Sequence, residues 1–260
     1  MKTSLLLLAS VALIHPTLAQ AGGIKKLADL DYAGNDNPKQ KLDLYLPEER
    51  GEEALPVVCW IHGGGWRNGD KRNGGRVSRL AATGKYAGIS IGYRLSGEAQ
   101  WPAQIHDCKA AIRWIRANAT KYNLDPKRIA VMGGSAGGHL VAMLGVSHGV
   151  EGLEGTIGPN REESSEVSCV INIFGPANFL TLNKHPSRID HYAANSPESL
   201  LLGGRVEEKK ELARQASPVT HASQDDEPML LIHGTKDRLV AHSQSVELQE
   251  ALEAAGVSAT

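Results

Sequence analysis

Short β-rich segments alternate along the chain with segments of helical periodicity. Residues 57–61 are uniformly apolar, which is typical of a buried parallel strand. Residues 41–46 instead alternate polar and apolar side chains, which predicts a half-exposed strand near a sheet edge. The other expected elements are, in chain order, a helix over 76–85, a strand over 87–93, a helix starting at Pro102, a strand over 128–132, a helix over 136–146, strands over 167–174 and 229–233, and a helix over 242–255. We therefore expect an α/β fold with a mostly parallel central sheet and helices on both faces.

No internal repeat or low-complexity linker divides this pattern, so a single domain is expected over residues 22–260. Residues 176–217 are rich in Pro, Asn and Ser and lie between two predicted strands. Such a composition is typical of irregular structure, and we expect a small lid-like insertion there.

The first 21 residues have the features of a secretory signal peptide. Lys2 supplies a positive start, residues 5–14 form a short apolar run, and small residues at 19–21 offer a cleavage site. The apolar run is about half of the ~20 residues that a membrane-spanning helix needs. We therefore expect a secreted or periplasmic protein with no membrane span.

The composition narrows the classes of partner. The chain has 260 residues with 28 basic and 29 acidic side chains, a balance that points to neither nucleic acid nor an anionic membrane surface. A hydrophobic content of 41% is enough for one sizeable core. Cys59, Cys108 and Cys169 lie in apolar or helical segments, where buried thiols are expected rather than a disulfide.

Residues 133–137 read Gly-Gly-Ser-Ala-Gly, which fits the pattern G-x-S-x-G between a predicted strand and a predicted helix. In this context, small flanking residues allow a sharp turn that raises the serine hydroxyl above the strand ends. The following helix directs its amide dipoles at developing negative charge. The pattern predicts Ser135 as a nucleophile. The alternative is a glycine-rich turn in which Ser135 only caps a helix.

A glycine loop, His62-Gly-Gly-Gly-Trp66, directly follows the 57–61 strand. At this position the backbone N–H groups of Gly64 and Gly65 are expected to join that of Ala136 in an oxyanion hole. His62 is expected to brace the loop rather than to transfer protons. A phosphate-binding loop is the alternative, but no Lys-Ser/Thr pair follows the glycines and no G-x-G-x-x-G occurs.

Asp237 follows the 229–233 strand and comes after Ser135 in the chain order Ser…Asp…His, so it is the predicted acid. The alternative is a turn-forming or solvated aspartate. The base should be a histidine in a loop after one more strand, beyond Thr260, and His242 is only a weak stand-in. His139 lies in the helix behind the elbow. Ordinary surface roles are expected for the histidines that precede the acid: His106, His148, His185, His191 and His221.

These features together resemble the esterase/lipase branch of the α/β-hydrolase superfamily, and more closely the group of bifunctional feruloyl and acetyl-xylan esterases (BD-FAE). The resemblance rests on residues 62–66, 101–107, 133–139, 196–199 and 233–237. It implies the α/β-hydrolase fold and ester hydrolysis through an acyl-enzyme on Ser135, with no cofactor and no metal. Similar proteins continue with a strand and a Gly-His loop, and residues 256–260 look like the opening of that strand. The resemblance therefore implies a C-terminally truncated domain that lacks its last strand, its last helix and its catalytic histidine.

Three functions follow as hypotheses. The first is a secreted carboxylesterase for a small-molecule or polysaccharide-linked ester, such as acetyl or feruloyl esters of plant polysaccharide. The second is an amidase such as an arylformamidase. The third is a non-catalytic binding protein, although retention of Ser135, the glycine loop and Asp237 favours an enzyme. Trp66 and Trp101 either line a substrate groove or pack in the core, and the oligomeric state stays open.

Overall fold

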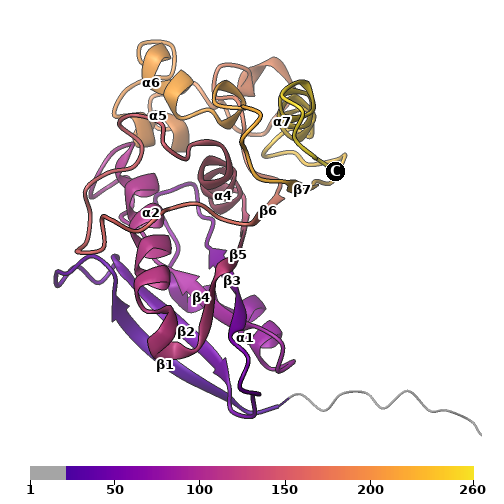
Figure 1. Ribbon diagram of the computed structural model, residues 1–260. Helices are drawn as coiled ribbons and strands as arrows, with labels where there is room; N and C mark the ends of the chain where they lie inside the picture. Colours follow the sequence, from indigo (N-terminus) through magenta and orange to yellow (C-terminus); the bar gives the residue numbers. More distant parts are fainter. Residues whose placement is uncertain (1–21) are drawn as a thin grey trace, which may run out of the picture.

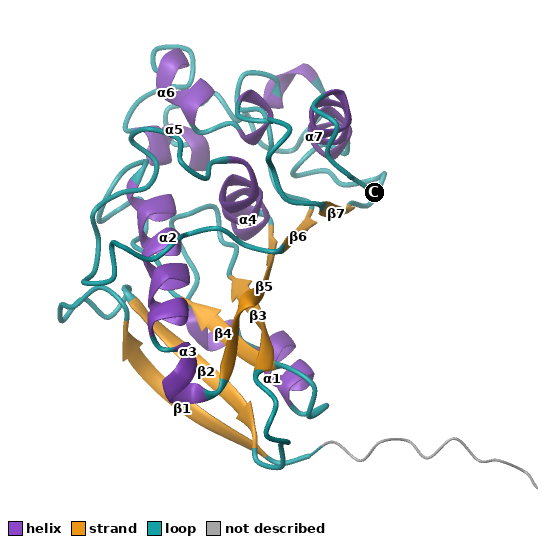
Figure 2. Ribbon diagram, viewed as in Figure 1, coloured by secondary structure: helices purple, strands orange, loops and turns teal. Residues whose placement is uncertain are grey.

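The computed structural model describes residues 22–260, so the expected signal peptide lies outside the described residues. A seven-stranded sheet forms the centre of the molecule, in the order β1-β2-β4-β3-β5-β6-β7 (Figures 1 and 2). Its strands are β1 (Ile24–Asp31), β2 (Lys41–Pro47), β3 (Leu55–Ile61), β4 (Ala87–Ile91), β5 (Leu124–Gly134), β6 (Cys169–Ile173) and β7 (Met229–Ile232). The pairings from β4 through β7 are parallel, whereas β2 runs antiparallel to both β1 and β4.

The helices cover both faces of this sheet, as expected. They are α1 (Gly75–Ala81), α2 (Ala103–Ala117), α3 (Ala119–Tyr122), α4 (Ala136–Val146), α5 (Pro197–Leu202), α6 (Lys210–Gln215) and α7 (Ser243–Ala254). In Figure 1, α2 and α4 lie on one side of the sheet and α1 on the other. The expected α/β fold with a mostly parallel central sheet is therefore confirmed. No helix in the described residues is long and apolar enough to cross a bilayer.

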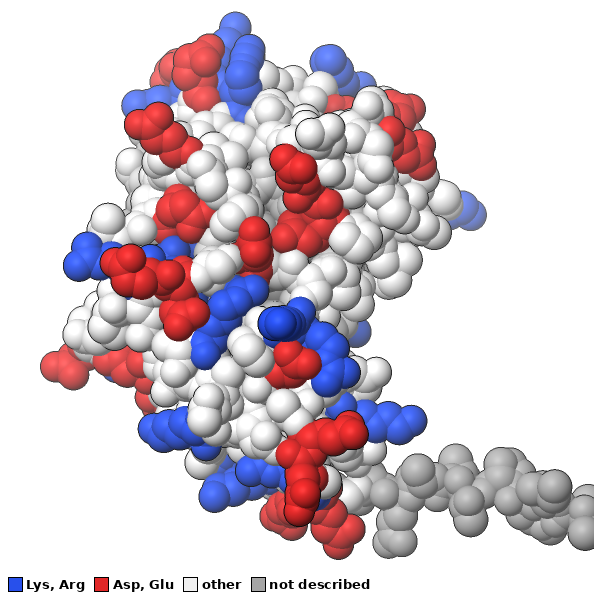
Figure 3. All heavy atoms as spheres, in the orientation of Figure 1, with Lys and Arg blue, Asp and Glu red and all other residues white. Residues whose placement is uncertain are grey.

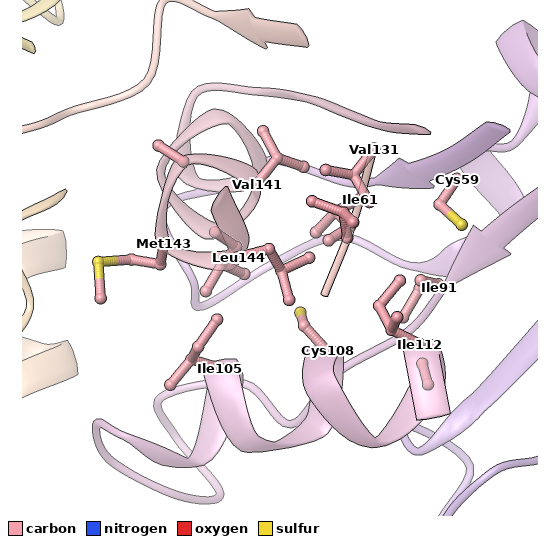
Figure 4. Close-up of a cluster of buried hydrophobic side chains, with 14 of the residues drawn as sticks. Cys59, Ile61, Ile91, Ile105, Cys108, Ile112, Val131, Val141, Met143 and Leu144 are labelled. Carbon is pink, nitrogen blue, oxygen red and sulfur yellow. The ribbon is translucent and has the colours of Figure 1, made fainter. Parts of the chain in front are cut away.

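Alternation along β3 explains how one strand serves two cores. Cys59 and Ile61 point into the main core with α2 and α4, whereas Val58 and Trp60 pack with Val77 of α1. Figure 4 shows the main core, where side chains of α2, α4, β3 and β5 meet. Fully burying one such aliphatic side chain stabilises the fold by about 1.5–3 kcal/mol. Within the described residues the three cysteines are free, with Cys59 and Cys108 buried and Cys169 partly so.

The strand over 41–46 lies near a sheet edge, as expected, but it is almost fully buried rather than half-exposed. A strand that the sequence pattern did not reveal, β1, pairs with β2 on its outer side, so β2 lies inside the sheet. The two charged side chains of β2, Lys41 and Asp43, are at least partly buried, and each forms an ion pair. Asp43 is fully buried, with its carboxylate 2.7 Å from Lys71 Nζ and 2.8 Å from Lys26 Nζ.

The insertion over 176–217 contains α5 and α6 and lies beyond the carboxyl ends of the parallel strands (Figure 1). Ser196 begins α5 as its N-cap and accepts a hydrogen bond from the Ser199 N–H. Elsewhere the surface is mixed in charge: on the face that Figure 3 shows, acidic and basic side chains are interspersed rather than sorted by sign.

The buried Asp43 carboxylate makes a testable contribution to stability. In Asp43→Ala, Lys71, whose side chain is only 8% exposed, keeps only the exposed Asp29 as an ion-pair partner, and breaking a buried pair typically costs about 3–5 kcal/mol. Lys26→Ala is the matched control, because the Lys26 side chain is 42% exposed and such pairs contribute at most about 1 kcal/mol. Urea unfolding of both variants measures the difference. Equal losses in the two would contradict this assignment.

Candidate active site

Ser135 lies between β5 and α4 in a backbone conformation that non-glycine residues rarely adopt. Its φ is 56° and its ψ is −124°, and such a conformation costs on the order of 1–3 kcal/mol. Hydrogen bonds hold the backbone in place: the Ser135 N–H donates to the Ile173 carbonyl at 3.0 Å, and the Ser135 carbonyl accepts from the His139 N–H at 3.0 Å. The hydroxyl makes no capping hydrogen bond to α4. The alternative of a serine that only caps the helix therefore does not describe this site.

Two glycines bring the elbow against the end of β3. A Cβ at Gly137 would lie 2.1 Å from the Ile61 carbonyl oxygen, and one at Gly63 would lie 2.6 Å from the Gly134 carbonyl oxygen. Neither position accepts a side chain without moving backbone. The first turn of α4 consequently packs directly on the start of the glycine loop.

The predicted oxyanion-hole residues meet Ser135 at one cavity. Gly64, Gly65 and Ala136 line a cavity of about 270 Å³ that also has half-buried Ser135 in its wall. Within residues 22–260, no backbone carbonyl accepts a hydrogen bond from the Gly64 or Gly65 N–H. The N–H of Ala136 is the first of α4 and has no partner inside the helix. Three free donors therefore belong to the wall that contains the serine.

Trp66 and Trp101 are both packed in the core. The indole N–H of Trp66 donates to His139 Nδ1 at 3.2 Å, and His139 Nε2 donates to the Ala216 carbonyl at 2.6 Å, which assigns His139 as a neutral ring. Burial lowers the pKa of His139 to about 4. Trp101 donates to Gln215 at 3.0 Å. Of the two tryptophans, Trp66 also lines the cavity and Trp101 does not.

Asp237 lies in the turn after β7. Its Oδ1 accepts the N–H groups of Leu239 at 2.7 Å and Val240 at 3.1 Å, and both of these residues line the cavity. Its Oδ2 lies 3.7 Å from His233 Nε2, which itself donates to the Val240 carbonyl at 2.9 Å. One oxygen of Asp237 thus forms the turn, as the alternative interpretation expected, and the other accepts no backbone N–H of that turn.

No hydrogen bond joins Ser135 Oγ to a histidine within the described part of the chain. His242 is half-buried at the start of α7, with its ring centroid 5.5 Å from that of His233, and it does not line the cavity. His62 braces the glycine loop, since it stacks on Tyr93 and its Nδ1 donates to the Gly63 carbonyl at 2.8 Å.

The last residues continue the sheet. Met229 N–H donates to the Ser258 carbonyl at 3.0 Å, and Leu231 N–H donates to the Thr260 carbonyl at 2.7 Å. The bridge between Met229 and Ala259 is parallel. Residues 258–260 therefore lie alongside β7.

The structure adds two residues that the sequence analysis missed. His191 is buried rather than at the surface, and it lines the cavity together with Glu198. Its Nδ1 lies 2.9 Å from Glu198 Oε1, and its Nε2 lies 3.0 Å from the Leu239 carbonyl oxygen. Burial alone would lower the pKa of His191, but the hydrogen bond and charge of Glu198 raise it above its usual value. Because Nδ1 faces a carboxylate and Nε2 faces a carbonyl oxygen, neither ring nitrogen is free to accept the proton of Ser135.

His139, which the sequence places in the helix behind the elbow, is fully buried there. No local signal in the sequence marks either of these histidines as buried, because each depends on contacts between distant segments. Among residues 22–260, no group of His, Cys, Asp and Glu side chains has an arrangement that would hold a metal ion.

Comparisons with known proteins place this geometry in a family. The BD-FAE sequence profile matches residues 42–252. The chain belongs to the BD-FAE family. Among solved structures similar to this BD-FAE domain, a truncated form of a carbohydrate esterase from gut microbiota superposes with a TM-score of 0.82 and 33% identity, over 91% of this chain and 86% of that one. A bifunctional GH43-CE protein of Bacteroides eggerthii gives a TM-score of 0.83 and 36% identity, over 90% of this chain and 31% of that one.

Curated proteins give a consistent result. Esterase LipC of Mycobacterium tuberculosis is 32% identical over 221 residues, which are 84% of this chain and 53% of LipC. The chain spans about half the length of the curated relatives it matches.

The neutral His139 predicts a pH dependence of stability. Its pKa falls from an ordinary 6.5 to about 4 on folding, so between these values the unfolded chain takes up a proton that the folded chain does not. Stability from this group is present above pH 6.5 and is lost as the pH falls toward 4. About 2 kcal/mol of the loss between pH 7 and pH 5 should disappear in His139→Gln. Urea unfolding of both proteins at the two pH values measures it, and parallel pH profiles would contradict the assignment.

Proposed function

We propose that this BD-FAE domain hydrolyses carboxylic esters through an acyl-enzyme on Ser135. The observation that carries the proposal is the joint placement of Ser135 and three free N–H donors, from Gly64, Gly65 and Ala136, on one cavity. Attack of Ser135 Oγ on the ester carbonyl carbon converts the carbonyl oxygen into an oxyanion. Donors already fixed by the backbone stabilise that charge without reorganising, which is the main source of rate in acyl transfer.

The remaining steps follow from the same chemistry. Collapse of the oxyanion expels the alcohol and leaves an ester bond to Ser135, and water then releases the acid. Proton removal from Ser135 requires a base, and Asp237 is the proposed acid that orients it, with the Oδ2 oxygen that the turn leaves free of N–H donors. His191 is unsuited to be that base because both of its ring nitrogens are engaged.

The domain extent, the export and the substrate class of the protein are part of the same proposal. We propose one domain over residues 22–260 with the 176–217 insertion as a lid-like cover, preceded by a signal peptide that directs the protein out of the cytoplasm. Acetyl or feruloyl esters of plant polysaccharide are the proposed substrates. Support comes from the similar structures, whose names describe a carbohydrate esterase and a bifunctional GH43-CE protein. Neither a cofactor nor a metal is part of the proposed mechanism.

The proposal is tested by hydrolysis of p-nitrophenyl acetate. Ser135→Ala should abolish the hydrolysis that passes through the acyl-enzyme, because it removes the nucleophile. Its unfolding midpoint should stay close to that of the parent protein, since the hydroxyl makes no hydrogen bond to the helix it begins. Ser223→Ala, in an exposed turn away from the cavity, is the matched control and should retain full activity.

Two results would contradict the proposed esterase activity on Ser135. Near-parental turnover in Ser135→Ala would remove Ser135 as the nucleophile. Cleavage of N-formylkynurenine by the parent protein, without cleavage of any ester in a p-nitrophenyl series, would favour an amidase instead.

A further inference from the structure

Glu198 places a buried carboxylate in the wall of the cavity that contains Ser135. It is 3% exposed and lies in the first turn of α5. The preceding residue, Pro197, packs on the glycine loop: its Cβ is 3.1 Å from where a Cβ of Gly65 would stand. The start of α5 therefore lies against Gly65, one of the proposed oxyanion donors.

The two oxygens of this carboxylate differ. Oε1 accepts the hydrogen bond from His191 Nδ1 at 2.9 Å, and His191 is fixed in turn by the Leu239 carbonyl. Oε2 is buried and has no hydrogen-bond partner in the described part of the chain. A buried acceptor without a donor costs about 1–3 kcal/mol, and more when it is charged. The unpaired Oε2 therefore destabilises the protein unless a bound ligand donates a hydrogen bond to it.

We propose that Glu198 is a specificity-determining residue, whose Oε2 accepts a hydrogen bond from a hydroxyl group of the bound ester. His191 is the positioning residue: it donates to Oε1 and thereby sets the direction of Oε2. This inference rests on the proposed function, because it assigns a role within the same cavity.

The charge of the pair selects a neutral hydroxyl over a cation. A carboxylate that already accepts a hydrogen bond from the His191 imidazole at 2.9 Å gains less from a cation than an isolated carboxylate would. A hydroxyl donates one hydrogen bond and adds no charge, and a hydrogen bond to a charged acceptor is about twice as strong as one between neutral groups. Esters that lack a hydroxyl would leave Oε2 unpaired in the complex and are discriminated against.

Two pairs of substrates test the role and locate the hydroxyl. In each pair the hydroxyl of one ester is replaced by a methyl group in the other: 2-hydroxyethyl acetate against propyl acetate probes the alcohol part, and ethyl glycolate against ethyl propionate probes the acyl part. The preference is the ratio of kcat/KM within a pair. Dividing the preference of the parent protein by that of a variant cancels the intrinsic reactivities of the esters.

In Glu198→Met, which removes the acceptor but keeps a similar volume, the preference should fall by at least about tenfold for one of the pairs. Ser199→Ala is the matched control, because Ser199 is a buried neighbour on α5 that does not line the cavity, and its preferences should equal the parental ones. Glu198→Gln keeps a neutral acceptor and should lose part of the preference. It replaces Glu198→Met in the test if that variant does not fold.

A binding experiment tests the role of Glu198 separately from the proposed catalysis. In the Ser135→Ala protein, NMR titration with the hydroxylated ester of the sensitive pair should give a dissociation constant that rises at least about tenfold when Glu198→Met is added. This result needs no turnover, so it stands or fails independently of catalysis. Unchanged preferences together with unchanged affinity for both hydroxylated esters would overturn the role of Glu198.

Discussion

The close approach of α4 to the end of β3 is the constraint on which the site depends. Because Gly137 has no side chain, the first turn of α4 rests against the Ile61 carbonyl, where a Cβ would come within 2.1 Å. This contact sets two features at once: the position of Ser135 at the head of α4 and that of the glycine loop that follows β3. Ser135 keeps its strained φ because its N–H donates a hydrogen bond and its carbonyl accepts one. These contacts offset the free energy of the strain.

A second set of contacts joins residues of the cavity wall. His191 joins the insertion to the turn after β7 through Glu198 and the Leu239 carbonyl. Asp237 holds the same turn by accepting the N–H of Leu239. The residues proposed for chemistry and those proposed for specificity therefore share one scaffold, and a disturbance of the turn reaches both.

Local patterns were enough to predict much of this architecture. The apolar run of β3, the Gly-Gly-Ser-Ala-Gly turn and α4 are each encoded within a few adjacent residues, and the structure has all three. The charged strand β1 escaped prediction because its partner strand supplies its stability. The burial of Asp43 and of the His191–Glu198 pair likewise depends on residues from other segments, which period and composition do not report.

If the elbow presents Ser135 as a reactive hydroxyl, covalent labelling should modify that residue in the folded protein. A fluorophosphonate reacts with a serine that is activated next to an oxyanion hole and mimics the tetrahedral intermediate when bound. Digestion and mass spectrometry of the labelled protein should find the adduct on the peptide that contains Ser135, in a folded sample and not in a urea-unfolded one. An adduct on a different residue, or equal labelling of the folded and unfolded chains, would contradict the account.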